Sequence, residues 1–187
     1  MENTIQGPRI RLEPLNQSHV PALWRALNSP EIWNHRHNSR VPRSEKDLEE
    51  FVKKAILRQL PYIIIDHENI IGTISLKITN HHNRVGEICY ILIGQKYSGK
   101  KYASEAIYLL IEYCFKILQY HRVEIEVLQD SAAEKLVTSL GLKCEGIKRE
   151  ARRIEEDKYT NLKLFSLLVS EYDSERMLDK VITNISS

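Results

Sequence analysis

The sequence lacks the features that mark secreted, membrane-spanning or nucleic-acid-binding proteins. Its only three cysteines, Cys89, Cys114 and Cys144, each lie in an apolar pattern without paired spacing, so we expect reduced core residues of a cytoplasmic protein. No apolar run approaches the roughly 18 residues that cross a bilayer, and the N-terminus has no apolar signal segment. The 27 basic and 25 acidic residues leave a net charge of +2. That charge is too small to argue for nucleic acid or an anionic membrane as an obligatory partner.

The chain of 187 residues is long enough for one domain, 1–187, with a single core that needs neither a disulfide nor a metal. A chain of this length buries about 70% of the surface that its unfolded form exposes. Hydrophobic periodicity predicts strands at residues 9–13, 62–66, 70–79, from near 85, at 122–128, and from 143 and 158. It predicts helices at residues 17–27, 30–33, 44–59 and 131–140, a long helix that ends at residue 118, and a last helix after residue 173. This order predicts an α/β fold, a mixed sheet of about seven strands flanked by helices.

The caps of these helices can be read from polar residues. Asn16 or Ser18 is expected to begin the first helix, and Ser44 with Asp47 resembles a capping box. Gly141 is expected to end the helix at 131–140. The last helix has two candidate caps, at positions 173 and 174.

The most informative segment is 87–106, where an acid opens a buried strand that leads through a Gly/Lys loop into a helix. Ile88, Tyr90 and Leu92 are expected on one face of the strand, and three further apolar residues on the other, which predicts a central strand. Those three residues are Cys89, Ile91 and Ile93. The helix carries one apolar stripe, made by Ala103, Ala106, Ile107, Leu110, Ile111, Cys114 and Leu118.

The loop between that strand and that helix predicts an anion site. A helix N-terminus carries about half a positive charge and four N–H groups without an intrahelical partner. Lys100 and Lys101 add full charges beside it. A phosphate-sized anion is therefore expected at one end of the strand and the carboxylate of Glu87 at the other.

These residues resemble the GNAT acyltransferases, in particular the RimJ/RimL-like branch. The resemblance is carried by Glu87, Ile88, Tyr90, Gly99, Lys100, Tyr102, Ala103, Glu105 and Ala106. Residues 70–74 resemble the strand before this core, and residues 127–142 resemble the strand and helix after it. The resemblance covers residues 8–172, nearly the whole chain.

The resemblance implies an N-acetyltransferase that moves an acetyl group from acetyl-CoA to a primary amine by direct attack in a ternary complex. Glu87 matches the general base, unless it only ends the strand or pairs with a nearby base such as Arg84. The implied cofactor-binding residues are Ile91, Leu92 and Ile93 for the pantetheine and thioester, Ser98, Gly99, Lys100, Lys101, Tyr102 and Ala103 for the pyrophosphate, and Asp130. No metal is implied.

Four residues depart from the family pattern: Ser98, Lys101, Asp130 and Ala133. Lys101 replaces a glycine whose missing side chain lets phosphates approach. Its side chain either obstructs the cofactor or turns its ammonium toward a phosphate oxygen. Lowered activity is expected. The alternative is a catalytically silent protein that binds acyl-CoA or serves as an interaction module.

The acceptor amine is not named by the sequence, and a protein N-terminus, as on ribosomal proteins, and a small molecule both stay open. Trp33, His35 and Arg36 are expected to touch it, with an exposed polar loop as the alternative. A metal at His35 and His37 is disfavoured because no third ligand has a fixed spacing. Glu124 and Glu126 are expected on a polar sheet face. The chain is expected to be a monomer or a homodimer.

Overall fold

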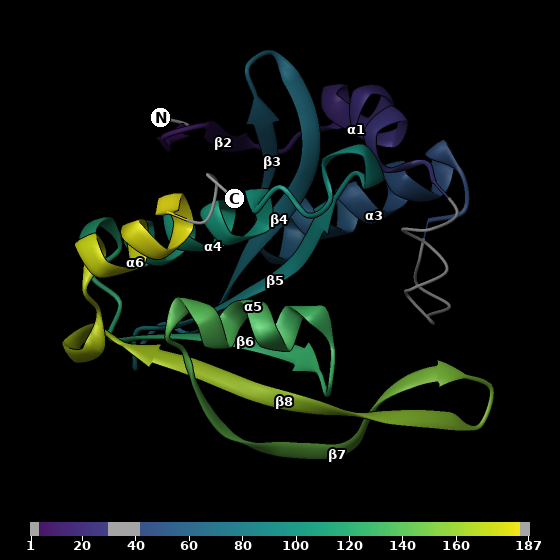
Figure 1. Ribbon diagram of the computed structural model, residues 1–187. Coiled ribbons are helices and arrows are strands. Elements are labelled where there is room, and N and C mark those ends of the chain that lie inside the picture. Colours follow the sequence, from purple (N-terminus) through teal and green to yellow (C-terminus); the bar gives the residue numbers. More distant parts are fainter. Residues whose placement is uncertain (1–3, 30–41, 184–187) are drawn as a thin grey trace.

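One sheet of eight strands organises the computed structural model, which describes residues 4–29 and 42–183 (Figure 1). The strand order is β1-β2-β3-β4-β5-β6-β8-β7. The strands are β1 (Ile5–Gln6), β2 (Ile10–Pro14), β3 (Leu60–Asp66), β4 (Asn69–Asn80), β5 (Val85–Ile93), β6 (Arg122–Leu128), β7 (Lys143–Glu155) and β8 (Lys158–Leu168). The helices are α1 (Val20–Leu27), α3 (Glu45–Arg58), α4 (Tyr102–Glu112), α5 (Ala132–Leu140) and α6 (Ser174–Ile182).

This architecture confirms the predicted α/β fold with a mixed sheet. Neighbouring strands are antiparallel except β5 and β6, which are parallel and are connected through α4. The strand not predicted is β1, which has two residues, too few for a periodic signal, and pairs with β2. The predicted turn at residues 30–33 lies outside the described residues.

Two clusters of buried side chains pack the helices against opposite faces of the sheet. The larger joins the sheet to α4, α5 and α6, and its members include Ile88, Ile107, Leu110, Val137 and Met177. The smaller joins it to α1 and α3, and its members include Leu23, Leu48, Val52, Ile63 and Leu92. Figure 1 shows α4 and α6 side by side, away from α1 and α3. The two faces of β5 therefore meet different layers of the fold.

The helix boundaries follow the polar caps. Ser44 accepts a hydrogen bond from the Asp47 N–H, and Ser131 and Asp173 cap α5 and α6 in the same way. Gly141 ends α5 with φ of 99°. The helix after the Gly/Lys loop changes at Tyr113–Ile117 into a π-helical turn, so it ends close to the predicted position.

Cys144 corrects one expectation of the sequence analysis. Cys114 is buried and Cys89 half-buried, but Cys144 is exposed on β7. β7 is the outermost strand of the sheet, and nearly all of its residues are exposed. An apolar neighbourhood in sequence does not bury a residue on an edge strand with both faces open.

The hairpin of β7 and β8 extends beyond the body of the domain at the lower right of Figure 1. It carries four basic residues, Lys148, Arg149, Arg152 and Arg153, and all of them are exposed. None of the described helices combines the length and apolarity that crossing a bilayer requires.

Candidate functional site

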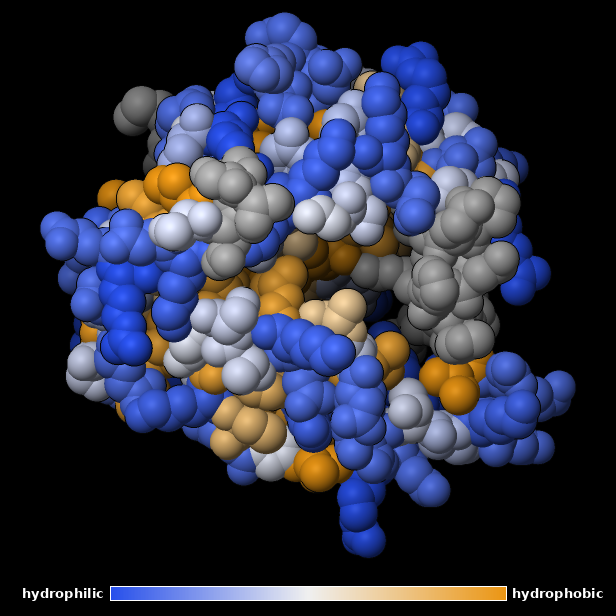
Figure 2. Space-filling view, in the orientation of Figure 1, coloured by the Kyte–Doolittle hydropathy of each residue, from blue (hydrophilic) through white to orange (hydrophobic). Residues whose placement is uncertain are grey.

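The central feature of the site is an opening between β5 and β6. The two strands pair only where Val85, Gly86 and Glu87 face residues 122–124. Beyond that point β5 continues to Ile93 and β6 to Leu128 without a shared ladder. Figure 2 shows a hollow near the middle of this face, where β5 and the start of α5 lie in Figure 1, with apolar side chains at its floor. The opening is thus closed at Glu87 and wide at the carboxyl ends of both strands.

A β-bulge in β5 turns the strand away from β6. Ser75 faces Cys89 while Thr73 faces Leu92, so two residues of β5 lie opposite one residue of β4. Tyr90, the first of the two, has φ of 52°. A bulge leaves its extra residue outside the regular ladder. Residues 90 and 91 of β5 therefore lie outside the regular β4–β5 ladder.

Gly72 allows this bulge. A Cβ at this position would lie 2.0 Å from the carbonyl oxygen of Leu92 on the neighbouring strand. Since atoms cannot approach so closely, only glycine lets β4 and β5 lie together at the bulge.

The bulge also corrects the predicted faces of β5. Ile88, Ile91 and Ile93 pack toward the α4 side of the sheet. Leu92 packs with α1 and α3, and Tyr90 contacts Phe51 of α3. One extra residue shifts the alternation by one, so the faces predicted from strict alternation are wrong after Cys89.

Glu87 lies at the closed end of the opening. Its side chain is 20% exposed and accepts a hydrogen bond from Lys77 Nζ of β4 at 3.2 Å. This hydrogen bond raises the pKa of Lys77 above its ordinary value. The ion pair considered in the sequence analysis therefore exists, but with Lys77. Arg84 donates instead to the carbonyl of Gln119.

A second carboxylate lies beside the first. Glu124 of β6 is the register partner of Glu87 and is 24% exposed. One of its oxygens accepts a hydrogen bond from Arg122 Nε at 2.8 Å. Glu126, two residues further along β6, forms an ion pair with Lys148. These contacts confirm the predicted polar face, and they place two carboxylates side by side at the junction of the strands.

The side of β5 that faces α3 presents aromatic and thiol groups. The rings of Tyr90 and Phe51 lie 5.4 Å apart in an edge-to-face arrangement. Cys89 Sγ lies 3.6 Å from Gln59 Oε1, and burial raises the pKa of this thiol to about 12. A thiol with such a pKa is not a nucleophile near neutral pH.

The loop at the wide end of the opening leads into α4 without a side-chain cap. Gly99 and Lys101 have positive φ values of 76° and 61°. Lys101 is the N-cap residue of α4, and no side chain accepts a hydrogen bond at this helix start. Side chains cap the starts of α3, α5 and α6, but not the start of α4. The first N–H groups of α4 are therefore donors that an anion can satisfy.

Asp130 lies at the same end of the opening, because parallel strands have their carboxyl ends together. It precedes the N-cap of α5, has φ of 59°, and its N–H donates to Glu134 at 2.7 Å. Ala133 lies in the first turn of α5. The predicted acceptor residues Trp33, His35 and Arg36 lie outside the described residues.

Sequence reasoning did not find the role of Glu105. Its side chain is fully buried in the first turn of α4 and bonds Arg9 and the backbone of β2. The available signal was a glutamate among residues that are otherwise apolar or small. All residues from Ser104 to Ile111 are buried, so the burial of α4 is wider than the single stripe predicted from the sequence. Tyr102 is anchored as well, since its hydroxyl donates to Asp66 at 2.7 Å.

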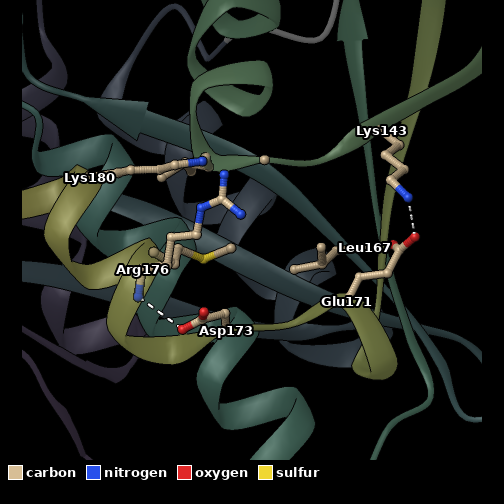
Figure 3. A pocket seen from close by; sticks show the side chains of 9 residues that line it. Lys143, Leu167, Glu171, Asp173, Arg176 and Lys180 are labelled. Carbon is tan, nitrogen blue, oxygen red and sulfur yellow. Dashed lines mark hydrogen bonds and ion pairs between the residues drawn. The ribbon is translucent and has the colours of Figure 1, made fainter.

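Two other hollows lie away from this opening. One of about 280 Å³ lies between the end of α5, β8 and α6, where Lys143 and Glu171 form an ion pair at 2.5 Å (Figure 3). Another of about 300 Å³ lies near residues 82–84 and 119–121, before the start of β5 and β6. Within residues 4–29 and 42–183, no group of three His, Cys, Asp or Glu side chains is placed to hold a metal ion.

Comparison with known proteins identifies the family. Residues 9–143 match the profile of an acetyltransferase (GNAT) domain. An uncharacterized N-acetyltransferase p20 of Bacillus licheniformis is 33% identical over 111 residues, 59% of this chain and 61% of that protein. The match thus spans about three fifths of this relative's length.

Solved structures share the fold over most of the chain. Mycobacterium smegmatis RimJ in complex with CoA-disulfide has a TM-score of 0.82 at 16% identity, covering 95% of this chain and 93% of RimJ. RimL, an apo ribosomal L7/L12 alpha-N-protein acetyltransferase, has a TM-score of 0.79 at 18% identity, covering 90% of this chain and 95% of RimL. The profile match covers well over half of the sequence, and the chain belongs to the GNAT acetyltransferase family.

Proposed function

We propose that this chain is a single-domain, cytoplasmic N-acetyltransferase that transfers the acetyl group of acetyl-CoA to a primary amine. The observation that carries the proposal is the opening between β5 and β6, with the carboxylate of Glu87 at its closed end and the uncapped start of α4 at its wide end. These are the two groups that the reaction needs at the two ends of acetyl-CoA.

The residues at the wide end fit a pyrophosphate. The first N–H groups of α4, with Lys100 and Lys101 beside them, offer positive charge and donors to an anion. Residues 98–103 would hold the pyrophosphate, Ile91, Leu92 and Ile93 would bind the pantetheine arm, and Asp130 would border the same end. The likeness in fold to RimJ, whose structure contains CoA-disulfide, supports this assignment.

The residues at the closed end fit proton transfer. Bound acetyl-CoA supplies an activated acyl group with a thiolate as leaving group. Glu87 accepts the proton that the acceptor ammonium must lose before its nitrogen can attack the acetyl carbon and break the C–S bond. Lys77 holds the carboxylate in place from the neighbouring strand. The high pKa of Cys89 favours direct attack over a covalent enzyme intermediate.

The acceptor that we favour is the α-amino group of a protein, as in the RimJ/RimL-like branch. The likeness in fold to RimL, named as an alpha-N-protein acetyltransferase of ribosomal L7/L12, supports this choice. Glu87 and Glu124 are neighbours across the β5–β6 ladder, and each carboxylate keeps acceptor capacity for an ammonium beside its bond to Lys77 or Arg122. A small-molecule amine is the second candidate, supported by the same pair of carboxylates.

Isothermal titration with acetyl-CoA, followed by a thiol-release assay, tests the proposal. The panel of acceptors contains peptides with free and blocked N-termini, polyamines and amino acids. We expect one acetyl-CoA to bind per chain and release of CoA thiol with the peptides that have free N-termini. Absence of acetyl-CoA binding would contradict the proposal. Binding without acetylation of any amine would favour the silent acyl-CoA-binding protein.

Replacing Lys101 with glycine is expected to stabilise the fold and weaken acetyl-CoA binding. Lys101 adopts a left-handed backbone conformation, which costs a non-glycine residue about 1 kcal/mol, so the free energy of unfolding should rise by that amount. Loss of the ammonium beside the pyrophosphate should raise the dissociation constant about fivefold. Urea unfolding and calorimetric titration measure the two effects.

The variant Lys101→Ala is the matched control for this prediction. It removes the same ammonium but keeps a side chain in the left-handed conformation, so it should weaken binding without stabilising the fold. Tighter acetyl-CoA binding by both variants would show instead that the lysine side chain obstructs the cofactor.

A further inference from the structure

We propose that Arg9 and Glu105 are positioning residues that hold the loop before α4 in its anion-binding shape. This inference rests on the proposed function, since it assigns the loop to the pyrophosphate of acetyl-CoA. The two residues are 96 positions apart in the sequence and form the main polar connection between β2 and the start of α4. We call this connection the Arg9–Glu105 clasp.

Glu105 provides the fixed half of the clasp. Its side chain has no exposed surface. One carboxylate oxygen accepts hydrogen bonds from the N–H groups of Arg9 at 2.8 Å and Ile10 at 3.1 Å, and the other from Arg9 Nε at 2.7 Å. Three donors to one buried carboxylate fix the position of the first turn of α4 relative to β2.

Arg9 extends the clasp into the loop itself. Its Nη1 donates to the carbonyl of Lys100 at 3.0 Å, and its guanidinium lies 4.9 Å from the centre of the Tyr102 ring. The peptide bond between Lys100 and Lys101 is trans, so its carbonyl and its N–H point in opposite directions. By holding this carbonyl, Arg9 turns the Lys101 N–H away from β2 and toward the side where an anion can bind.

The clasp also has an electrostatic consequence. A carboxylate in the first turn of α4 would repel a phosphate at the same helix end. The guanidinium of Arg9, 2.7 Å from Glu105, offsets this negative charge. Arg9 Nη2 is buried without a hydrogen-bond partner, so the guanidinium is not placed for ion-pair stability alone. Its orientation is instead the one that reaches both Glu105 and the loop carbonyl.

The variant Arg9→Lys separates the two roles of Arg9. Lysine keeps a positive charge for Glu105 but has no planar fork that reaches Lys100 as well. We expect its dissociation constant for acetyl-CoA to rise about tenfold, the value of one charged hydrogen bond. Binding of S-acetylpantetheine, which lacks the pyrophosphate, should not change. Isothermal titration measures the first constant and NMR titration the second.

A second variant tests the other half of the clasp, and a third provides the control. Glu105→Gln keeps an acceptor for the backbone N–H groups but loses the charged bond from Arg9 Nε, so we expect acetyl-CoA binding to weaken less than in Arg9→Lys, with S-acetylpantetheine binding unchanged. Arg11→Lys changes the arginine two positions further along, within β2, whose partners are Glu13 at 2.7 Å, Glu68 and the His67 carbonyl. It should leave both dissociation constants at their wild-type values.

Amide NMR spectra of the protein without ligand give a readout that is independent of acetyl-CoA. Arg9→Lys should shift the amide resonances of Lys101 and Tyr102, and Arg11→Lys should not. Unchanged loop resonances, or equal weakening of acetyl-CoA and S-acetylpantetheine, would overturn the role of the clasp. If the wild-type protein binds no acetyl-CoA but the loop resonances still shift, the proposed function fails, and with it the assignment of the clasp to pyrophosphate.

Discussion

Replacing Glu87 with glutamine should lower kcat by about a hundredfold or more while acetyl-CoA binds with its wild-type dissociation constant. Glutamine keeps the shape of the side chain at the closed end of the opening, but it cannot accept the proton of the acceptor ammonium. The carboxylate does not lie in the loop that we assign to the pyrophosphate, so cofactor binding should be preserved. Thiol-release kinetics and calorimetric titration on the same preparation measure both quantities.

The neighbouring carboxylate supplies a matched control for this experiment. Glu124 lies directly opposite Glu87, and the two side chains are 24% and 20% exposed. Glu124→Gln therefore removes an equal charge from the same face, and we expect kcat to fall less than about tenfold because the base remains. Equal losses in the two variants would show that the face acts by its charge, and an undiminished kcat in Glu87→Gln would remove Glu87 as the base.

Replacing Gly72 with alanine should destabilise the protein by about 3 kcal/mol or more and abolish acetyl-CoA binding. The added Cβ would lie 2.0 Å from the Leu92 carbonyl oxygen, a backbone atom that moves only if β5 moves. The expected result is loss of the bulge, and with it the opening between β5 and β6. Urea unfolding gives the free energy of unfolding, and calorimetry gives the binding.

Gly146 is the control position for this substitution. It also lies in a strand, but a Cβ there has no atom within 4 Å. Gly146→Ala should change the free energy of unfolding by no more than about 0.5 kcal/mol. A Gly72→Ala protein as stable as wild type, with normal acetyl-CoA binding, would contradict the assigned role of the glycine.

Local signals were sufficient to predict most of the fold. The strand at 122–128 matches β6, and the capping side chains of Ser44 and Ser131 mark the observed starts of α3 and α5. Strand periodicity and helix capping both depend on neighbours close in sequence. Here the tertiary structure agrees with these local preferences, so the predicted elements form where the sequence places them. The short strand β1 has no such signal and depends on pairing with β2.

The faces of β5 could not be predicted in the same way. Alternation along the sequence assumes a regular strand, but the bulge at Tyr90 depends on which residue of β4 is a glycine and where it pairs. That information lies on another strand. The exposure of Cys144 is a similar case. It depends on β7 being the outermost strand of the sheet, which the sequence of β7 does not show.

The residues of the candidate site also differ in whether the sequence predicts them. Glu87, Lys101 and the helix that follows are contiguous in sequence, and their order alone predicted a carboxylate and an anion site at opposite ends of one strand. Lys77 comes from β4, and Arg9 reaches Glu105 across 96 positions. These partners are set by tertiary structure, so a single sequence without pairing information does not reveal them.

The short ladder between β5 and β6 divides the sheet into two units. β1 to β5 form one antiparallel unit and β6, β8 and β7 form another, and three residue pairs are the whole ladder between them. Hydrogen bonds between these two parts are therefore few along the line where a ligand would insert. A molecule lying in that gap would contact both units and join them where the backbone hydrogen bonds do not.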